Sequence, residues 1–381
     1  MDLQESRKKI DKIDDELVKL FEERMAVSAE VAEYKRQTGK AVLDPARERA
    51  KMADISSKSK ENMRSYMRVL YSLIFELSRA YQCSLLNKDS ELYTNISKAI
   101  DTTPKVFPKE AKIACQGVEG AYSQAACQKL FAFPDINYYS SFRKVFTAIE
   151  SGECDYGILP LENSTAGSVN KVYDLMIEHK FHIVRSVRVK IDHSLMAKKG
   201  TKLSDIKEII SHEQALNQCS AFISSLGKNV KVTAVENTAK AAETVSKSEK
   251  GDIAAICSKS CQDLYGLECL QSSIQDAGNN HTRFICISKK LEIYPGADRT
   301  SLMLVAPHSP GSLYRVLARF YALGINLQKL ESRPIPNEDF EFMFYFDLDA
   351  SIYSPEFIQL MCELDGLCDD FKYLGSYTEI I

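Results

Sequence analysis

The chain has 381 residues, of which 45% are hydrophobic and 27% charged, and its formal net charge is −3 at pH 7. This length predicts a globular protein with two or three domains, and the mixing of basic with acidic residues argues against a nucleic-acid partner. No apolar run reaches membrane-spanning length, and the charged beginning lacks a signal-peptide core. Eleven cysteines without CxxC pairs predict reduced thiols in a cytoplasm rather than disulfides or a zinc site.

The first predicted element is a long amphipathic helix that carries three cations, Arg7, Arg24 and Lys35. Arg24 takes a position on its apolar stripe, and a buried guanidinium must meet an anion there, because an unpaired buried charge is costly. Taken alone, Arg24 is explained better by an ion pair with a carboxylate of a neighbouring helix. The stripe that predicts one buried face consists of Ile10, Ile13, Leu17, Leu20, Val27 and Val31.

Helix geometry relates the three cations to one another. Arg24 and Lys35 lie within roughly 20° of each other and about 16 Å apart along the axis, so they can hold one small ligand. Arg7 lies about 25 Å from Arg24 along the same helix and can reach that ligand only from a second copy of the chain. A site that uses all three therefore implies a dimer with shared sites.

Two further helices are predicted before residue 87. Asp44 and Pro45 read as an N-cap followed by a proline at the first helical position, and capping is the simplest role for Asp44. A third helix over about 63–86 places Ser78 and Gln82 one turn apart. Beside them lies a predicted buried edge of Leu70, Ile74, Leu77 and Tyr81.

The segment from about Ser6 to Leu86 resembles the all-helical chorismate mutase family. Eight positions match the active-site pattern of that family in order: Arg7, Arg24, Lys35, Asp44, Arg47, Glu48, Ser78 and Gln82. The resemblance implies a three-helix domain whose long first helices interlock in a dimer, with the first arginine donated across it. The implied substrate is chorismate, which rearranges to prephenate without a nucleophile, so that positioning and electrostatics supply the catalysis.

The same resemblance implies a role for each of these residues. Carboxylates of chorismate would be held by three arginines with the help of Ser78. Glu48 and Asp44 would fix the ring hydroxyl. Lys35 and Gln82 would act as catalytic donors to the ether oxygen, where negative charge grows as the C–O bond breaks. The three arginines are Arg7, Arg24 and Arg47.

A polar stretch over 87–111, with Pro104 and Pro108, predicts a linker. From Lys112 onward, short apolar runs alternate with amphipathic segments, which predicts an α/β domain. The predicted strands are 113–115, 156–159, 206–210, 230–235, 253–256 and 284–287.

Two of these strands lead into small polar residues, at 117–123 and 162–168. Junctions of this kind can present backbone N–H groups to an anion, but simple helix capping by Ser123 and Ser164 explains each one better when it is considered alone. Neither matches a dinucleotide or P-loop fingerprint. A third motif, Thr282-Arg283-Phe284, predicts a strand in which Thr282 and Phe284 face one way and Arg283 the other.

The segment from Ala111 to about Ser288 resembles the prephenate dehydratase family. It carries G-x-x-G-x-Y-S at 117–123, P-x-E-N-S-x-x-G at 160–167, S-H-x-x-x-x-x-Q-C at 211–219, and T-R-F at 282–284. Many relatives have proline at the position of Val118. The resemblance implies a two-lobed fold similar to periplasmic binding proteins, and an enzyme that protonates a departing hydroxide as prephenate loses carbon dioxide.

The implied acid is the hydroxyl of Thr282, and His281 is a competing acid, although a lone loop histidine is more often a bystander. The resemblance also implies a set of residues that bind prephenate: Glu162, Asn163, Ser164, Ser211, Gln218, Thr282, Arg283 and Phe284.

After Pro295 and Gly296 a third unit is predicted in the order βαββαβ, which suggests a ferredoxin-like sandwich. Two segments resemble the signatures of ACT regulatory domains, at 310–314 and 330–334; the first reads Gly-Ser-Leu where relatives often have Gly-Ala-Leu. The resemblance implies L-phenylalanine as an effector. A purely structural sandwich is the alternative. The implied binding residues are Pro310, Gly311, Ser312, Leu313, Glu331 and Ser332.

The three resemblances together indicate a multidomain protein of the bifunctional chorismate mutase and prephenate dehydratase type. The expected domains are a helical mutase at 1–88, a linker at 89–111, a dehydratase at 112–289 and an ACT unit at 298–378. Chorismate, prephenate and L-phenylalanine are the expected ligands, in a homodimer or larger homo-oligomer without cofactor or metal. An arogenate dehydratase and a non-catalytic phenylalanine sensor are the alternatives.

Overall fold

The computed structural model describes residues 2–381 except 87–90, 228, 309, 337–340, 355–356, 358–359, 362, 365–367 and 369. The described chain divides into two compact units. The first comprises Met1–Lys98, Gly311–Leu323 and Tyr353–Asp370. The second comprises Ala99–Pro310, Gly324–Ile352 and Phe371–Ile381.

Three helices at the N-terminal end of the chain confirm the helical prediction: α1 (Leu3–Thr38), α2 (Pro45–Lys58) and α3 (Arg64–Leu86), with the short 3-10 turn η1 (Glu61–Met63) before α3. The Asp2 side chain accepts from the backbone N–H of Gln4 and caps α1, which ends at Gly39 with φ of 65°. Asp44 caps α2 as predicted, with Pro45 in the first helical turn.

The predicted burial of the apolar stripes is wrong within a single chain. Every predicted stripe residue of α1 remains at least 40% exposed, from Val31 at 40% to Leu20 at 60%. On α3, Leu70 and Tyr81 are also exposed, whereas Ser78 and Gln82 are buried. The reason is geometric, because the buried Ser78 and Gln82 of α3 contact Arg24 and Lys35 of α1, whereas the stripe of α1 stays exposed and the predicted edge of α3 is at most half-buried.

The predicted linker contains a helix, α4 (Glu91–Thr102), so the expectation of an irregular segment is wrong there. Polar residues dominate the composition, but Ile96 and Ala99 fall at helical spacing and both are buried. This short apolar face was the signal that the composition concealed. Residues 87–90 of the predicted linker lie outside the described part of the chain.

The first lobe of the α/β region is built on a mixed sheet with the order β16-β5-β11-β3-β1-β2, in which β4 also pairs with β3. Helices α5 (Tyr122–Leu130), α6 (Phe142–Ser151) and α7 (Asn170–Glu178) follow its strands. The strands are β1 (Glu110–Gln116), β2 (Phe133–Tyr139), β3 (Tyr156–Asn163), β4 (Gly167–Ser168), β5 (His182–Lys190), β11 (His281–Ser288) and β16 (Glu379–Ile380).

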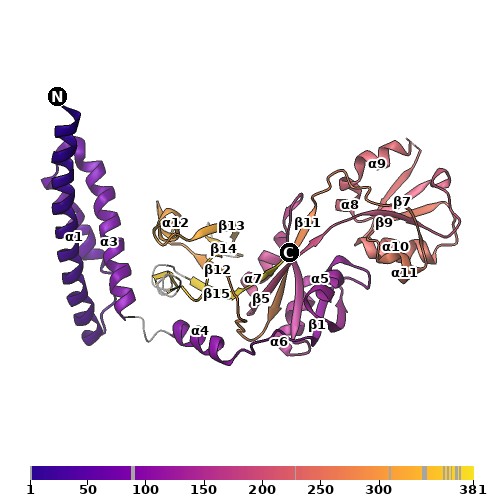
Figure 1. Cartoon of the computed structure of the whole chain (residues 1–381), viewed down its shortest axis with the longest axis horizontal. Helices are drawn as coiled ribbons and strands as arrows, with labels where there is room; N and C mark the ends of the chain where they lie inside the picture. The colour runs from indigo at the N-terminus through magenta and orange to yellow at the C-terminus, as the bar shows by residue number, and fades with distance from the viewer. Residues whose placement is uncertain are drawn as a thin grey trace. The chain divides into compact units, whose positions relative to one another are not determined.

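The second lobe is a separate sheet with the order β10-β6-β9-β7-β8, so the expectation of two lobes is confirmed. The chain passes between the lobes twice, once between β5 and β6 and once between β10 and β11 (Figure 1). Its strands are β6 (Ser194–Ala197), β7 (Glu208–Ser211), β8 (Lys231–Ala234), β9 (Ile253–Cys257) and β10 (Glu268–Gln271). Its helical segments are η3 (Leu203–Asp205), α8 (Glu213–Gln218), α9 (Ser220–Ser225), α10 (Thr238–Lys247) and α11 (Cys261–Tyr265).

The last strands form a sheet in the order β13-β14-β12-β15, with antiparallel β12/β14 and β13/β14 pairs. This is the strand order of a ferredoxin-like sandwich, as predicted, with α12 (Ser312–Ala322) between β12 and β13. The predicted helix over 357–364 falls partly outside the described residues. The strands are β12 (Arg299–Val305), β13 (Asn326–Pro334), β14 (Phe342–Asp349) and β15 (Asp370–Tyr377).

One face of this C-terminal sheet packs on the first lobe. Met303 and Tyr345 of the sheet share a hydrophobic cluster with Leu159, Leu161 and Tyr173 of the lobe. After β15, the short strand β16 pairs in parallel with β5 and so joins the sheet of the first lobe. The C-terminal sheet is therefore buried against the lobe that carries the T-R-F motif.

Two further expectations concern the chain as a whole. The ten cysteines in the described ranges form no disulfide with one another. No described helix combines the length and the hydropathy that a membrane span requires.

Candidate active sites

A cavity of about 470 Å³ lies among α1, α2 and α3. Seven of the eight residues predicted for the first site line it, namely Arg24, Lys35, Asp44, Arg47, Glu48, Ser78 and Gln82. The eighth, Arg7, is exposed near the opposite end of α1 and does not contribute to the lining. The long helix thus separates Arg7 from the rest of the set, as its rise per residue requires.

Arg24 has no carboxylate partner in the described chain. Its guanidinium donates to the hydroxyl of Ser78, and burial lowers its pKa below the ordinary value. The alternative of a structural ion pair between helices is therefore wrong for Arg24. A partly buried cation that meets only a neutral hydroxyl leaves the cavity complementary to an anionic ligand.

Lys35 and Gln82 meet at the other side of the same cavity. The Lys35 ammonium donates to Gln82 Oε1 at 3.1 Å and to the Val42 carbonyl at 2.5 Å. Because Gln82 uses its carbonyl oxygen for Lys35, its NH₂ group is directed elsewhere and can donate to a ligand. Asp44 Oδ1 accepts from the backbone N–H of Arg47 at 3.0 Å, so its capping role is confirmed.

Sequence reasoning missed Arg79, which also lines the cavity and forms an ion pair with Glu48. Positions 75, 78, 79 and 82 share one face of α3 at i, i+3, i+4 and i+7, so the spacing of Ser78 and Gln82 was sufficient to find it. The cavity is strongly cationic, because its charged lining consists of Arg24, Lys35, Arg47, Lys51 and Arg79 against Asp44 and Glu48.

The second site centres on Asn163, at the end of β3. Its Nδ2 donates to Thr282 Oγ1 at 2.9 Å and to Asn280 Oδ1 at 2.7 Å. Its Oδ1 accepts from the backbone N–H groups of Thr165 at 3.1 Å and Ala166 at 2.9 Å. The backbone donors fix which end of the amide faces Thr282.

Gln218 brings the second lobe into this arrangement from the end of α8. Its Nε2 donates to Thr165 Oγ1 at 2.9 Å, and its Oε1 accepts from Asn280 Nδ2 at 3.0 Å and lies 3.1 Å from His193 Nε2. The structure thus brings together three residues expected from the motifs, Asn163, Gln218 and Thr282. Sequence reasoning missed Thr165, His193 and Asn280, which lie outside the signatures or at variable positions within them.

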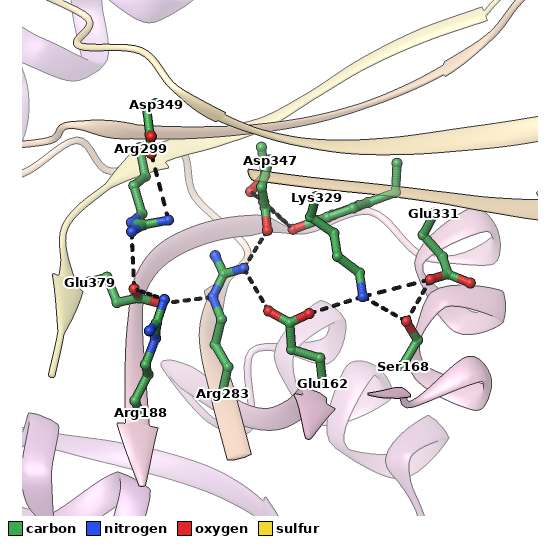
Figure 2. A network of polar contacts seen from close by, with 12 residues as sticks. Glu162, Ser168, Arg188, Arg283, Arg299, Lys329, Glu331, Asp347, Asp349 and Glu379 are labelled. Atoms are coloured by element: carbon green, nitrogen blue, oxygen red, sulfur yellow. Dashed lines mark hydrogen bonds and ion pairs between the residues drawn. The ribbon is translucent and has the colours of Figure 1, made fainter. Parts of the chain in front are cut away.

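Glu162 and Arg283 do not face this hydrogen-bonded cluster, contrary to expectation. β3 and β11 are antiparallel, with Thr282 opposite Asn163 and Arg283 opposite Glu162. Because successive side chains of a strand point to opposite faces, the second pair faces away from the first. Both side chains are directed toward the C-terminal sheet instead (Figure 2).

Figure 2 shows the polar network that these two residues enter. Arg283 pairs with Asp347 of β14 and with Glu379 of β16, the latter at 3.0 Å. Glu162 pairs with Lys329 of β13 at 2.9 Å and lies 3.4 Å from Arg283. Glu379 also pairs with Arg188 at 2.8 Å, so the network links β5, β11 and β3 to the C-terminal sheet.

Ser211 and Phe284 are likewise not available to a ligand. Ser211 is fully buried and its hydroxyl donates to the Ile256 carbonyl at 2.5 Å. Phe284 is 3% exposed and packs in the hydrophobic core of the first lobe. Both expectations placed a residue in the pocket because it belongs to a motif, but packing or a backbone hydrogen bond occupies the side chain.

Ser164 and His281 hold the loop before β11 in place. Ser164 Oγ donates to the Asn279 carbonyl at 3.1 Å and accepts from the His281 N–H at 2.9 Å. The His281 ring lies 3.1 Å from the same carbonyl and makes no hydrogen bond with Thr282 in the described chain. Ser164 therefore fixes the backbone of the loop rather than capping a helix, since Val169 stands at the N-cap of α7.

The G-x-x-G-x-Y-S loop also departs from the capping expectation. The Ser123 hydroxyl donates to the Gln116 carbonyl at 2.8 Å, while Ala121 occupies the N-cap of α5. Gly120 has φ of 87°, and a Cβ there would lie 3.1 Å from Cys261 Sγ of the second lobe. This glycine permits the close approach of the two lobes.

Two family models match the chain at separate places. Residues 6–83 match chorismate mutase type II, and residues 113–292 match prephenate dehydratase. The bifunctional chorismate mutase/prephenate dehydratase of Aquifex aeolicus is 30% identical over 382 residues, covering 100% of this chain and 99% of the relative. The chain belongs to this bifunctional family.

Two further matches cover the part that follows the mutase region. Arogenate dehydratase 1 of Petunia hybrida is 37% identical over 304 residues, 74% of this chain and 71% of the relative. The crystal structure of a prephenate dehydratase in complex with L-Phe from Arthrobacter aurescens is 28% identical, with a TM-score of 0.65, and covers 70% of this chain and 90% of that one.

In this member of the bifunctional family, the residues expected to bind an effector lie in two places, at the start of α12 and on β13. Gly311 precedes α12 with φ of 82°, and Ser312 is buried in the first turn of that helix. Glu331 accepts from Ser168 of the first lobe at 2.5 Å, so its carboxylate is committed to the network of Figure 2. Ser332, one residue further along β13, is exposed. Pro310 is exposed as well.

Proposed function

We propose that this chain catalyses two consecutive steps of L-phenylalanine synthesis. The first converts chorismate to prephenate, and the second converts prephenate to phenylpyruvate with loss of carbon dioxide and water. The observation that carries this proposal is the presence of both family regions in one chain, which aligns with a bifunctional relative over its whole length.

The cationic cavity of the helical region suits the first reaction. Chorismate is a dianion, and Arg24 offers it a guanidinium that no carboxylate of the described chain neutralises. We assign Arg24 and Arg47 to the carboxylates, with Ser78 orienting Arg24. Lys35 and the NH₂ group of Gln82 donate to the ether oxygen, so they stabilise charge that grows only in the transition state.

Glu48 and Asp44 are assigned to the ring hydroxyl, although both carboxylates have partners without substrate. Glu48 pairs with Arg79, and Asp44 caps α2. A carboxylate that already accepts one hydrogen bond retains lone pairs for a second. Each of the two can therefore still accept a hydrogen bond from the ring hydroxyl.

The first site is completed by a second copy of the chain in this proposal. Arg7 lies far from the cavity on the same helix, and the α1 stripe from Ile10 to Leu20 is exposed in the single chain. An apolar stripe of this length on a helix is typical of a helix–helix interface. Pairing two α1 helices would bury the stripe and bring Arg7 of one chain to the cavity of the other.

For the second reaction, the Thr282 hydroxyl is assigned as the acid that protonates the departing hydroxide. Thr282 accepts a hydrogen bond from Asn163, and its own proton has no acceptor among the described residues. A hydroxyl held in this way is ready to donate to a substrate bound beside it. Asn163 and Gln218 contribute the neighbouring amides, while Glu162 and Arg283 act on the far side of the sheet.

We further propose that strands β12–β15 together with α12, here called the C-terminal unit, are an ACT regulatory domain that binds L-phenylalanine. Its strand order is that of a ferredoxin-like sheet, and the similar dehydratase from Arthrobacter aurescens was crystallised with L-Phe. The start of α12 offers backbone N–H groups to the carboxylate of the amino acid. Glu331 supports this unit through Ser168 rather than contacting the effector.

A chorismate time course tests the two-step proposal. Prephenate and phenylpyruvate are quantified separately after the full chain is mixed with chorismate. We expect prephenate to appear first and phenylpyruvate to follow. Consumption of chorismate without phenylpyruvate would disprove the second activity, and no consumption would favour a non-catalytic sensor.

An arogenate dehydratase is the second candidate for the later step, because the Petunia enzyme is 37% identical. Arogenate differs from prephenate in carrying an amino group in place of the side-chain ketone. The mutase region favours prephenate, since it would supply that compound directly. Comparing kcat/KM for the two substrates decides between them.

A further inference from the structure

His193 lies in the first passage between the two lobes and has no role in the chemistry assigned above. It is 2% exposed, and its Nε2 is 3.1 Å from Gln218 Oε1. Its backbone N–H donates to Gln275 of the second passage at 3.0 Å, and the Tyr122 ring packs edge-on against it. The backbone of His193 is thus tied to the second passage, and its imidazole contacts Gln218 of the second lobe and Tyr122 of the first.

Thr282 and His193 are connected by a series of side-chain hydrogen bonds that runs through Asn163, Asn280 and Gln218. Two backbone N–H donors determine which atom donates in each of these bonds. Asn163 Oδ1 accepts from the N–H groups of Thr165 and Ala166, so this atom is an oxygen and cannot donate. Thr165 Oγ1 is 2.7 Å from the same oxygen and must therefore give its proton to it. The Thr165 oxygen is then an acceptor for Gln218 Nε2.

The same reasoning fixes the other end of Gln218. Asn280 Oδ1 accepts from Asn163 Nδ2, so Asn280 Nδ2 donates to Gln218 Oε1 at 3.0 Å. Gln218 Oε1 can only accept, which requires the proton of His193 to reside on Nε2. In this network the hydroxyl proton of Thr165 is used, whereas the hydroxyl proton of Thr282 has no acceptor among the described residues.

The other ring nitrogen of His193 favours the neutral imidazole. Nδ1 is buried and has no partner in the described structure, so a second proton there would be a buried donor without an acceptor. Burial lowers the pKa of His193, while Gln218 and Asp192 oppose this shift more weakly. A neutral imidazole with its proton on Nε2 is the form that the geometry demands.

We propose that His193 is a positioning residue for the dehydration, whose Nε2–H helps to hold the Gln218 amide in the orientation that keeps this hydrogen-bond network aligned beside Thr282. This inference rests on the proposed role of Thr282. Without the donor, Gln218 Oε1 keeps only the hydrogen bond from Asn280 Nδ2, so rotation of the amide is opposed less strongly. In the rotated state Thr165 would donate to Gln218 instead of Asn163, and the link between the lobes would lose its fixed direction.

The test compares two substitutions of similar size in the full chain. His193→Leu removes the donor, and His193→Gln retains an amide N–H that can replace Nε2–H. We expect His193→Leu to lower the kcat for dehydration at least tenfold with less than a threefold change in KM, and His193→Gln to remain within threefold of the wild type. Equal losses in both variants would overturn the proposal, because a packing role does not distinguish them.

A second measurement keeps the proposal testable if His193→Leu weakens folding of the lobes. Thr165 is exposed, so Thr165→Val should fold, and it breaks the same chain of hydrogen bonds. The double variant should lose less kcat than the product of the two single-variant factors, since both substitutions interrupt one network. Multiplying effects would show that the two residues act independently and would overturn the inference.

Controls separate this inference from the proposed function. Mutase turnover by the same variants should stay within twofold of the wild type, which verifies that the chain is intact. If the wild type dehydrates arogenate and not prephenate, the substrate assignment fails, but the ratio of the Leu and Gln variants still tests His193. If Thr282→Ala retains full activity, the role of Thr282 fails, and the proposal for His193 fails with it.

Discussion

The guanidinium of Arg283 pairs with the carboxylate of Asp347, which joins β11 of the first lobe to β14 of the C-terminal sheet. The two side chains are only 5% and 1% exposed. Burial would lower the pKa of Arg283, but Tyr377 and Asp347 together raise it above the ordinary value. Because Arg283 directly follows Thr282, the C-terminal sheet is attached to the strand that carries the proposed acid.

Replacing Asp347 with asparagine should destabilise the α/β region substantially. The change leaves Arg283 buried with one anion fewer, and breaking a buried pair typically costs about 3–5 kcal/mol. Scanning calorimetry should show a lowered transition, and dehydratase activity should fall while mutase activity persists. Asp349→Asn, on the same strand, is the control, because its pair with Arg299 is long at 3.8 Å and partly exposed. Equal stability of the two variants would contradict a structural role for the Arg283 pair.

Arg24→Ala and Lys35→Ala should each abolish most mutase turnover and leave dehydration of added prephenate nearly intact. Removal of one donor to a transition-state charge typically costs about 3–4 kcal/mol. Steady-state kinetics on chorismate and on prephenate measure both activities in one preparation. Arg36→Ala serves as the control, since that residue pairs with Glu33 on the outer surface of α1. Near-normal mutase turnover in Arg24→Ala would refute the assignment of the cavity.

Mixing two inactive variants should restore part of the mutase activity. If Arg7 of one chain completes the cavity of another, a heterodimer of Arg7→Ala and Arg24→Ala chains contains one intact site. Refolding the two together and assaying chorismate turnover tests this. A failure to recover activity, in samples where mass spectrometry shows heterodimers, would rule out shared sites.

Thr282→Ala should lose dehydratase activity, and Thr282→Ser should keep part of it. The reason is that the proposed acid needs a hydroxyl at this position, whereas the methyl group serves only to orient it. Rates of phenylpyruvate formation from prephenate measure the difference. If the alanine and serine variants are equally active, the proton donor lies elsewhere, and His281 is the next candidate.

L-Phenylalanine should inhibit dehydration through the C-terminal unit, with a coupling of about 1–3 kcal/mol. Gly311→Ala should weaken this inhibition, because φ of 82° strains an alanine at the start of α12. Gly324→Ala, with φ of 65° beyond the other end of the helix, is a control with matched strain. Inhibition curves and calorimetric titration with L-phenylalanine compare the two.

Deleting the C-terminal unit is a less informative test than these substitutions. Truncation after Ser288 would remove Asp347 and Glu379 from Arg283, and it would uncover the Tyr173 cluster. We therefore expect the truncated chain to lose dehydratase activity along with inhibition. A truncated protein that still responds to phenylalanine would contradict the regulatory assignment.

The sequence was informative about site residues where a chemically suitable side chain lies within a recognisable motif. The motifs singled out Asn163, Gln218 and Thr282, which the structure brings into one hydrogen-bond network from the end of β3, the end of α8 and the start of β11. It was misleading at Glu162 and Arg283, since a motif does not state which face of a strand a side chain occupies. Alternation along β3 and β11 contained that information, but the partners on the other face, Asp347 and Lys329, lie far away in the chain.

Burial in the helical region could not be predicted from periodicity alone. The apolar stripe of α1 is real, but its cover is absent from the single chain, whereas polar Ser78 and Gln82 are buried against α1. The helix α4 was hidden by its polar composition. Pairing of β16 with β5 depends on a contact between segments almost 200 residues apart, which no local pattern encodes.

The alternation at Thr282 and Arg283 also bears on how β11 finds its register. A slip of one residue would turn the guanidinium to the face that carries Asn163 and the hydroxyl toward Asp347, because side chains alternate with a period of two. Asp347 would then be left without its cation, in a region that excludes water. A shifted strand is therefore destabilised by an unpaired buried charge as well as by lost packing. The ion pair thus favours the native register of β11 over a shifted one.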